Sequence, residues 1–155
     1  MINSSSLKKL IEPHFHKLLA SQNYSTREVD AVDLLTSSRL DVAFKLLFLE
    51  IYDLNQAYAI EIYKEHLKAA TSNTYTEFGN SEKNSLDKFI KIFFQIHDSM
   101  QSGFNSKVSL IPISENGGIL NGSHRIASAI LLDKKVCVVN IEYPPEIQNY
   151  EFFLK

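Results

Sequence analysis

The chain has 155 residues, which fits one domain, and its 45% hydrophobic and 22% charged residues are ordinary for a globular protein. This composition excludes a disordered tail, a collagen-like fibre and a membrane span. Sixteen Lys and Arg against eighteen Asp and Glu give a net charge of −2, without the basic excess typical of duplex nucleic-acid binding, although a local basic patch stays open. The single cysteine, Cys137, excludes an internal disulfide and a zinc site built on several thiolates.

The N-terminal part of the chain is expected to be mainly helical. Apolar residues recur near a 3.6-residue period in 7–20, 39–54, 56–70 and 85–101, which predicts four helices. Ser25 and Glu28 have capping-box spacing and predict a further short helix that ends near Leu35. The polar stretch 71–84 contains Gly79 and is predicted to be a loop. Residues 1–20 lack the apolar core of a secretory signal, so we expect a cytoplasmic protein.

The C-terminal third has a different pattern. Stretches 108–113 and 136–143 are rich in Val and Ile and predict strands, with a shorter strand at 119–120. Gly122 ends that short strand, and a helix is expected over 123–132, with a short tail element over 146–154. The order predicts one domain of the α+β class over 1–155. Residues 1–104 form its mainly helical part, and residues 105–155 form a strand–turn–helix–strand unit. A small mixed β-sheet from this C-terminal third is expected to pack against several of the N-terminal helices.

The turn from Asn121 to Arg125 carries the most chemical information. A strand ends there, a glycine permits a tight turn and a helix begins at once, so the first N–H groups of that helix form a candidate anion site. Arg125 offers a fork for phosphate, and His124 can donate a hydrogen bond or move a proton. Asn121, Gly122 and Ser123 complete the candidate phosphate site. The structural alternative is that Ser123 only caps the helix and Arg125 reaches a surface carboxylate.

Gly122-Ser123-His124-Arg125, the helix residues that follow and the strand Lys135-Val136-Cys137-Val138-Val139 together resemble the signature of the ParB/sulfiredoxin superfamily. The likeness covers about 108–141 and implies a ParB/sulfiredoxin-like fold whose turn holds nucleotide phosphates. Ser123 stands where sulfiredoxins carry their catalytic cysteine, so thiol repair is not expected. About twelve residues follow the last predicted strand, so the helix-turn-helix reader of partition proteins is not expected.

The small-molecule members of that superfamily therefore offer the best comparison. They include free-serine kinases that use ATP or ADP, and small proteins associated with surface-polysaccharide synthesis. This chain is most similar to the latter group, also in Arg39-Leu40-Asp41, Lys45, Tyr63, His66 and Gly103-Phe104.

Asp41 and Lys45 lie four residues apart on the predicted helix 39–54 and share a stripe with Phe48. If that stripe meets the glycine turn, Lys45 can neutralise a phosphate, and Asp41 can bind a hydroxyl or Mg²⁺. Arg39 falls on the expected solvent face, from which it can still offset phosphoryl charge. Two alternatives remain open: Asp41 completes a capping box with Ser38, or Asp41 and Lys45 form a plain surface pair.

Glu77 lies in the predicted polar loop. A loop carboxylate near a bound phosphate is a reasonable general base for phosphoryl transfer, and the alternative is a merely solvated side chain. No pair among the histidines has the i, i+4 spacing of a helical zinc site, so His66 and His97 are expected to be structural and no metal site is predicted.

The sequence thus predicts a nucleotide-binding, kinase-like phosphotransferase that uses ATP, ADP or another nucleotide, with Mg²⁺ carried in by the phosphates. Asp41, Lys45 and Glu77 are the candidate catalytic residues. The acceptor is expected to be a sugar or an amino-acid-like metabolite, and a place in surface-polysaccharide synthesis rests on the resemblance alone. The alternatives are a non-catalytic ParB-like module that binds a nucleotide or nucleic acid, and a scaffold protein in which Arg125 pairs with a carboxylate.

Overall fold

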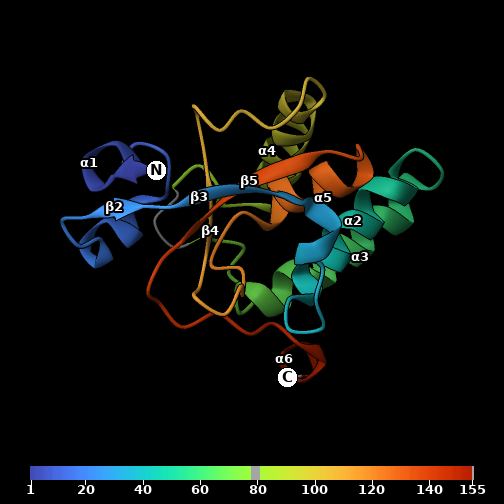
Figure 1. Ribbon diagram of the computed structural model, residues 1–155. Helices are drawn as coiled ribbons and strands as arrows, with labels where there is room; N and C mark the ends of the chain where they lie inside the picture. Colours follow the sequence, from blue (N-terminus) through green and yellow to red (C-terminus); the bar gives the residue numbers. More distant parts are fainter. Residues whose placement is uncertain (78–80, 155) are drawn as a thin grey trace.

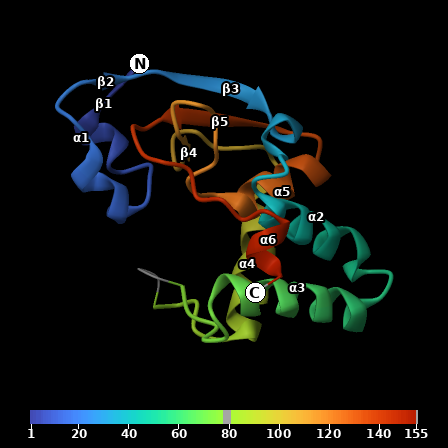
Figure 2. The same ribbon diagram turned by 90° about the horizontal axis from the view of Figure 1, so that it is seen from below.

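The computed structural model describes residues 1–77 and 81–154. A three-stranded sheet lies on one side of the molecule, and helices α5, α2 and α3 stack below it with α4 alongside (Figures 1 and 2). The described residues form a mixed α+β structure, as predicted. None of the helices in this part of the chain has both the length and the apolar character needed to cross a membrane.

The sheet has the order β3-β5-β4. The central strand β5 (Lys135–Asn140) runs antiparallel to β3 (Thr26–Asp30) and parallel to β4 (Ile111–Ile113). The four middle residues of β5 are all buried, because side chains that alternate along the strand enter two different apolar clusters. Val136 and Val138 face the cluster formed with the helices, whereas Cys137 and Val139 face a second cluster formed with the N-terminal segment.

Four helices form the larger layer. They are α2 (Leu40–Tyr52), α3 (Gln56–Ala70), α4 (Leu86–Met100) and α5 (Ser123–Leu131). Asn55 and Ser85 cap α3 and α4, since each side chain accepts a hydrogen bond from a first-turn N–H group. Phe48, Tyr63 and Phe93 are fully buried where α2, α3 and α4 meet, and this aromatic centre joins the three helices.

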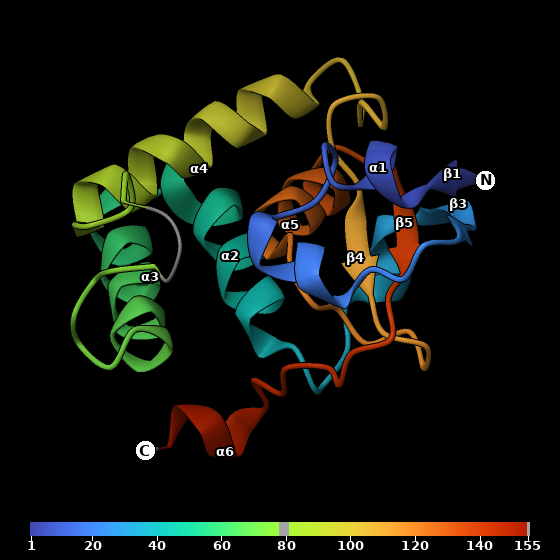
Figure 3. The same cartoon turned by 90° about the vertical axis from the view of Figure 1, so that its left-hand side faces the viewer.

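Short elements complete the chain. The second cluster is covered by the N-terminal segment (Figure 3), in which two-residue strands β1 (Ile2–Asn3) and β2 (Asn23–Tyr24) pair with each other. The remaining elements are α1 (Ser4–Leu7), the 3₁₀ turns η1 (Pro13–Leu18) and η2 (Ala31–Leu34), and α6 (Tyr150–Phe153) near the C-terminus.

Two predicted N-terminal helices are wrong. The expected helix over 7–20 is replaced by the end of α1 and by η1, because Pro13 begins a new turn and cannot continue a helix. The expected helix after Ser25 is instead β3 followed by η2. Pairing of β3 with the buried strand β5 outweighs the local capping pattern. The sheet therefore draws one strand from the N-terminal part, and the prediction of a sheet built only from the C-terminal third is incorrect.

The other predicted elements are confirmed. Helices occur as α2, α3, α4 and α5, and strands occur as β4 and β5, each within a few residues of the predicted bounds. The short strand at 119–120 is present as a single bridge between Ile113 and Ile119. Residues 71–77 and 81–84 are loop, whereas Gly79, on which part of that prediction rests, lies outside the described residues.

Candidate functional site

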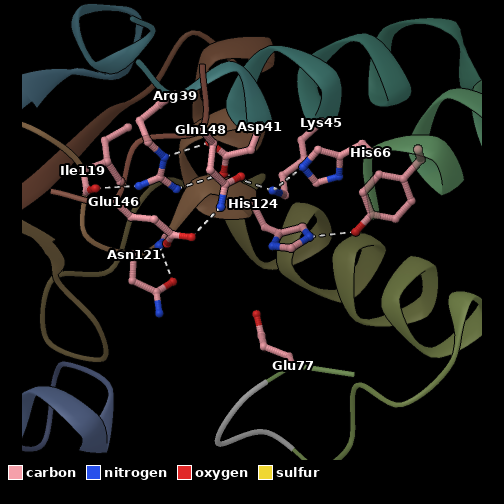
Figure 4. A network of polar contacts seen from close by, with 12 residues as sticks. Arg39, Asp41, Lys45, His66, Glu77, Ile119, Asn121, His124, Glu146 and Gln148 are labelled. Atoms are coloured by element: carbon pink, nitrogen blue, oxygen red, sulfur yellow. Dashed lines mark hydrogen bonds and ion pairs between the residues drawn. The ribbon is translucent and has the colours of Figure 1, made fainter. Parts of the chain in front are cut away.

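A cavity of about 290 Å³ lies where several distant parts of the chain meet. The start of α2, the second half of α3, the loop before α4, the turn before α5 and the C-terminal segment all contribute to its lining. Figure 4 shows its main polar groups, which come from all five of these parts. The polar residues that line it include Arg39, Asp41, Lys45, His66, Glu77, Asn121, Ser123, His124, Glu146 and Gln148.

Three charged side chains are buried together beside this cavity. Arg39, Asp41 and Lys45 are 3%, 2% and 4% exposed. Nε and Nη2 of Arg39 donate to the two carboxylate oxygens of Asp41 at 2.8 and 2.9 Å, and Nζ of Lys45 donates to Oδ2 at 3.2 Å. The alternative of a plain surface pair is therefore wrong, as is the prediction that Arg39 faces solvent. The capping-box alternative also fails, because the residue before α2 is Arg39 and no side chain caps the helix.

Arg39 also ties this trio to the glycine turn. Its Nη1 donates to the carbonyl oxygen of Ile119 at 2.5 Å, and Ser123 in the first turn of α5 helps to lower the pKa of Asp41. Figure 4 shows Ile119, Arg39, Asp41 and Lys45 linked in one network. The expected meeting of the Asp41–Lys45 stripe with the turn before α5 thus occurs.

The trio shifts the protonation of its own members. Burial alone would raise the pKa of Asp41, but Lys45, and then Arg39 and Ser123, outweigh it and hold that pKa well below its usual range. Burial lowers the pKa of Lys45, and the Asp41 carboxylate offsets part of that effect. Asp41 is therefore a permanent carboxylate and a poor proton acceptor.

Two histidines stand beside the trio. Burial, and then the nearby Lys45, lower the pKa of both His66 and His124 well below the usual range, so both rings are neutral. Nε2 of His66 lies 3.5 Å from Nζ of Lys45, which can only donate, so Nε2 accepts and Nδ1 carries the hydrogen. Nε2 of His124 is 2.8 Å from the hydroxyl of Tyr63, a buried group whose pKa burial raises well above its usual value. His66 is thus a site residue and not only a core residue.

The glycine turn has the expected form. Gly122 has a φ of 99°, which favours glycine, and a Cβ atom there would lie 2.6 Å from Cδ1 of the buried Ile111. Its N–H donates to the side chain of Asn121, and α5 begins at the next residue. Ser123 and His124, in the first turn of the helix, both line the cavity.

The structure places Arg125 away from the cavity. Its guanidinium pairs with Glu12 at 2.7 Å and also donates to the Ser109 hydroxyl and to the Leu110 carbonyl oxygen. These contacts fasten α5 to the N-terminal segment and to the approach of β4. They match the structural alternative, in which Arg125 binds a protein carboxylate.

Glu77 lies in the loop between α3 and α4 and lines the cavity from the side opposite the trio. Nζ of Lys83 lies 2.9 Å from Oε2 and 3.1 Å from Oε1 of the Glu77 carboxylate. Lys83 is itself buried and sits 5.4 Å above the ring of Phe89. This ion pair fixes a loop carboxylate at the wall of the cavity. Such a group is positioned to accept a proton from a bound hydroxyl.

The polar cavity residues that were not predicted include His14, Thr71 and Thr76, and also Glu146 and Gln148. Glu146 and Gln148 follow Pro144-Pro145 in a stretch that looks like a plain tail. The backbone of Gln148 pairs with Ser38 and Leu40 at the start of α2, and this long-range pairing brings both side chains to the cavity. No periodic or spacing signal in the sequence points to such a contact.

Comparison with known proteins identifies no relative: no family model matches the chain, and no curated protein and no solved structure is significantly similar to it. Across residues 1–77 and 81–154, no group of three or more His, Cys, Asp or Glu is arranged to hold a metal ion. The site is therefore interpreted from its own chemistry.

Proposed function

We propose that this chain is a nucleotide-binding, kinase-like phosphotransferase that acts on a hydroxyl group of a small metabolite. The observation that carries the proposal is the burial of Arg39 and Lys45 beside the same cavity that the first turn of α5 lines. Buried cations and helix N-termini both stabilise phosphate groups, and here they converge on one cavity of ligand size.

Phosphate binding falls to Lys45 and to the start of α5. The first N–H groups of a helix have no partner within it, so those of Ser123 and His124 are suited to phosphate oxygens. Lys45 neutralises charge on the transferred phosphoryl group, and Arg39 adds to the positive potential while holding Asp41. Asn121 contributes its amide at the edge of the turn. We do not include Arg125 in this set, since its guanidinium binds Glu12.

Glu77 is the proposed general base. It takes the proton of the acceptor hydroxyl, the hydroxyl oxygen forms a bond to the terminal phosphorus, and the phosphoanhydride bond to the leaving nucleotide breaks. Asp41 does not take this proton, because it is buried with two cations, Arg39 and Lys45, that hold its pKa well below its usual range. Its role is to hold the two cations in place.

ATP or ADP is the proposed phosphoryl donor, with Mg²⁺ entering on its phosphates. Asp41 is unsuited to bind that ion, because both of its carboxylate oxygens already accept hydrogen bonds from cations. The acceptor as a sugar or amino-acid-like metabolite, and a place in surface-polysaccharide synthesis, are proposed only on the resemblance of 122–125 to the ParB/sulfiredoxin motif.

Nucleotide binding and turnover test the proposal in that order. ATP, ADP, CTP, GTP and inorganic phosphate, each with and without Mg²⁺, are added in a thermal-shift assay. A nucleotide at 100 times its Kd stabilises the native state by about 2.7 kcal/mol, which is about 5–10 °C for a domain of this size. The shift should vanish in Lys45→Met and persist in the matched variant Lys64→Met, whose lysine pairs with Glu61 in solvent.

Turnover is then followed by ³¹P NMR with the bound nucleotide and a set of sugars and hydroxy amino acids. Formation of a phosphomonoester, lost in Glu77→Gln, supports the transferase. The proposal fails if no nucleotide shifts the midpoint, or if the Lys45→Met protein shifts as much as the wild type. A shift without any phosphomonoester supports a second candidate, a ParB-like binding module without turnover. The pairing of Asp41 with both cations favours that candidate, since it leaves Asp41 inactive as a base.

A further inference from the structure

The C-terminal segment forms one wall of the cavity and is firmly held there. The N–H of Gln148 donates to the carbonyl oxygen of Ser38 at 2.8 Å, and its own carbonyl oxygen accepts from the N–H of Leu40 at 2.9 Å. At the end of the segment, the ring of Phe153 in α6 packs against the ring of His66, with 5.6 Å between centroids. Figure 2 shows α6 beside α3, in agreement with the contacts between these helices. Residues 146–153 are thus part of the site and not a free tail.

The amide of Gln148 has a defined orientation. The residue is 8% exposed, and its side-chain Nε2 lies 2.8 Å from Oε1 of Glu146. A carboxylate only accepts hydrogen bonds, so the amide nitrogen must face Glu146 and the amide oxygen must point the other way. Among the described residues, no group donates to this buried oxygen. A buried oxygen without a donor is costly, and Gln148 lines the cavity, so a ligand hydroxyl or N–H group that reaches this oxygen would satisfy it.

The charges around Gln148 favour a ligand hydroxyl over a ligand ammonium group as the hydrogen-bond donor. Figure 4 shows its side chain near Arg39 and Asp41, with the carboxylate of Glu146 close to the amide nitrogen. Arg39 and Lys45 share one carboxylate, Asp41, so these three buried side chains keep one net positive charge in the cavity lining, which repels a ligand ammonium group. The Glu146 carboxylate attracts such a group, but it is exposed and its charge is screened by solvent. A neutral hydroxyl meets no such repulsion. It can donate to Gln148 or Glu146 and still accept a hydrogen bond elsewhere.

We propose that Gln148, with Glu146 beside it, forms the acceptor subsite, and that this subsite selects a neutral polyhydroxyl compound, a sugar or a polyol, over an amino acid. The inference rests on the proposed function in that it divides one cavity between two ligands. Phosphates lie at the Lys45 end, by the start of α5, and the acceptor lies against the C-terminal segment. Gln148 is a specificity-determining residue in this scheme and takes no part in proton transfer.

Ligand-observed saturation-transfer NMR on the full chain tests the subsite without nucleotide. The probes are glucose, galactose, N-acetylglucosamine, glycerol, myo-inositol and L-serine. Gln148→Met keeps the side-chain length and the backbone bonds to α2 but removes the amide. Gln95→Met, at an exposed glutamine on α4, is the matched control. Circular dichroism verifies that each variant is folded.

We expect at least one neutral polyhydroxyl probe to bind, with at least tenfold weaker binding to Gln148→Met and no change in Gln95→Met. Glu146→Gln should keep the affinity within about threefold, since its amide oxygen still accepts from a hydroxyl. The nucleotide-induced thermal shift should be the same in Gln148→Met as in the wild type, because the proposed phosphate end is untouched.

Three results would overturn the inference: none of the neutral probes binds, binding is unchanged in Gln148→Met, or L-serine alone binds and is lost in Glu146→Gln. The last result would show that the subsite takes an ammonium group. Failure of the proposed function is separable from these. Nucleotide binding that depends on Lys45, without polyol binding that depends on Gln148, refutes the subsite alone. Polyol binding that depends on Gln148, without any nucleotide shift, refutes the phosphotransferase.

Discussion

Replacement of Asp41 by Asn is the most direct test of the buried charges. The carboxylate accepts three hydrogen bonds from Arg39 and Lys45, all between 2.8 and 3.2 Å, and all three residues are less than 5% exposed. Asparagine keeps the shape of the side chain but removes the negative charge that compensates Arg39 and Lys45. Both oxygens of Asp41 accept hydrogen bonds from cations, so in either orientation of the asparagine amide its NH₂ group would face a cationic donor.

The expected cost follows from this loss of charge compensation. Breaking a buried ion pair by removing one partner costs about 3–5 kcal/mol. With an unfolding entropy of about 2.1 cal/mol/K per residue, each kcal/mol corresponds to about 3 °C in a chain of this length, so Tm should fall by about 9–15 °C. Lys45→Met should cost less, about 1.5–3 kcal/mol, since it leaves the two-bond contact between Arg39 and Asp41 intact. The double variant should cost less than the sum of the two single variants.

Urea unfolding followed by circular dichroism measures these free energies. Tyrosine fluorescence is a second probe, because the chain has seven Tyr and no Trp. Asp53→Asn, at an exposed aspartate after α2, is the matched control and should stay within about 0.5 kcal/mol of the wild type. A cost below about 1 kcal/mol for Asp41→Asn would refute the reasoning, because it would mean that water, and not Asp41, compensates the two cations.

Three further predictions concern single residues. His66 stays neutral in the native state, so below a pH of about 6.5 only the unfolded chain takes up a proton at this residue. Acidification from pH 7 to 5.5 should therefore lower the free energy of unfolding of the wild type by up to about 1.4 kcal/mol more than that of His66→Phe, as measured by urea unfolding. Gly122→Ala should lower the free energy of unfolding by about 1–3 kcal/mol more than Gly103→Ala in the same assay. Both glycines have a positive φ, but only a Cβ atom at Gly122 would clash with Ile111, so equal losses would contradict this reasoning. Arg125→Met should lower Tm but leave the nucleotide-induced thermal shift unchanged, and loss of that shift would make Arg125 a phosphate ligand after all.

Strong local patterns determined most of the helices and the strands of the C-terminal part. Helices α2, α3, α4 and α5 have apolar faces or caps that act within a few residues, and the turn at Gly122 is likewise a local requirement. The same reasoning failed at β3, where a capping-box spacing predicted a helix. That segment is a strand because β5, more than a hundred residues later in the chain, pairs with it.

The chemistry of the candidate site divides in the same way. The sequence by itself determined that Asp41, Lys45 and the turn before α5 carry groups suited to phosphate, because charge and hydrogen-bonding capacity belong to the residue type. The sequence predicted a solvent-exposed Arg39 and a phosphate-binding Arg125, and it contained no signal that Gln148 belongs to the site. Only the tertiary structure buries Arg39 against Asp41, pairs Arg125 with Glu12 and brings Gln148 to the cavity. Burial and ion pairing depend on which distant segments fold together, and they decide which of the available charges face a ligand and which hold the protein together.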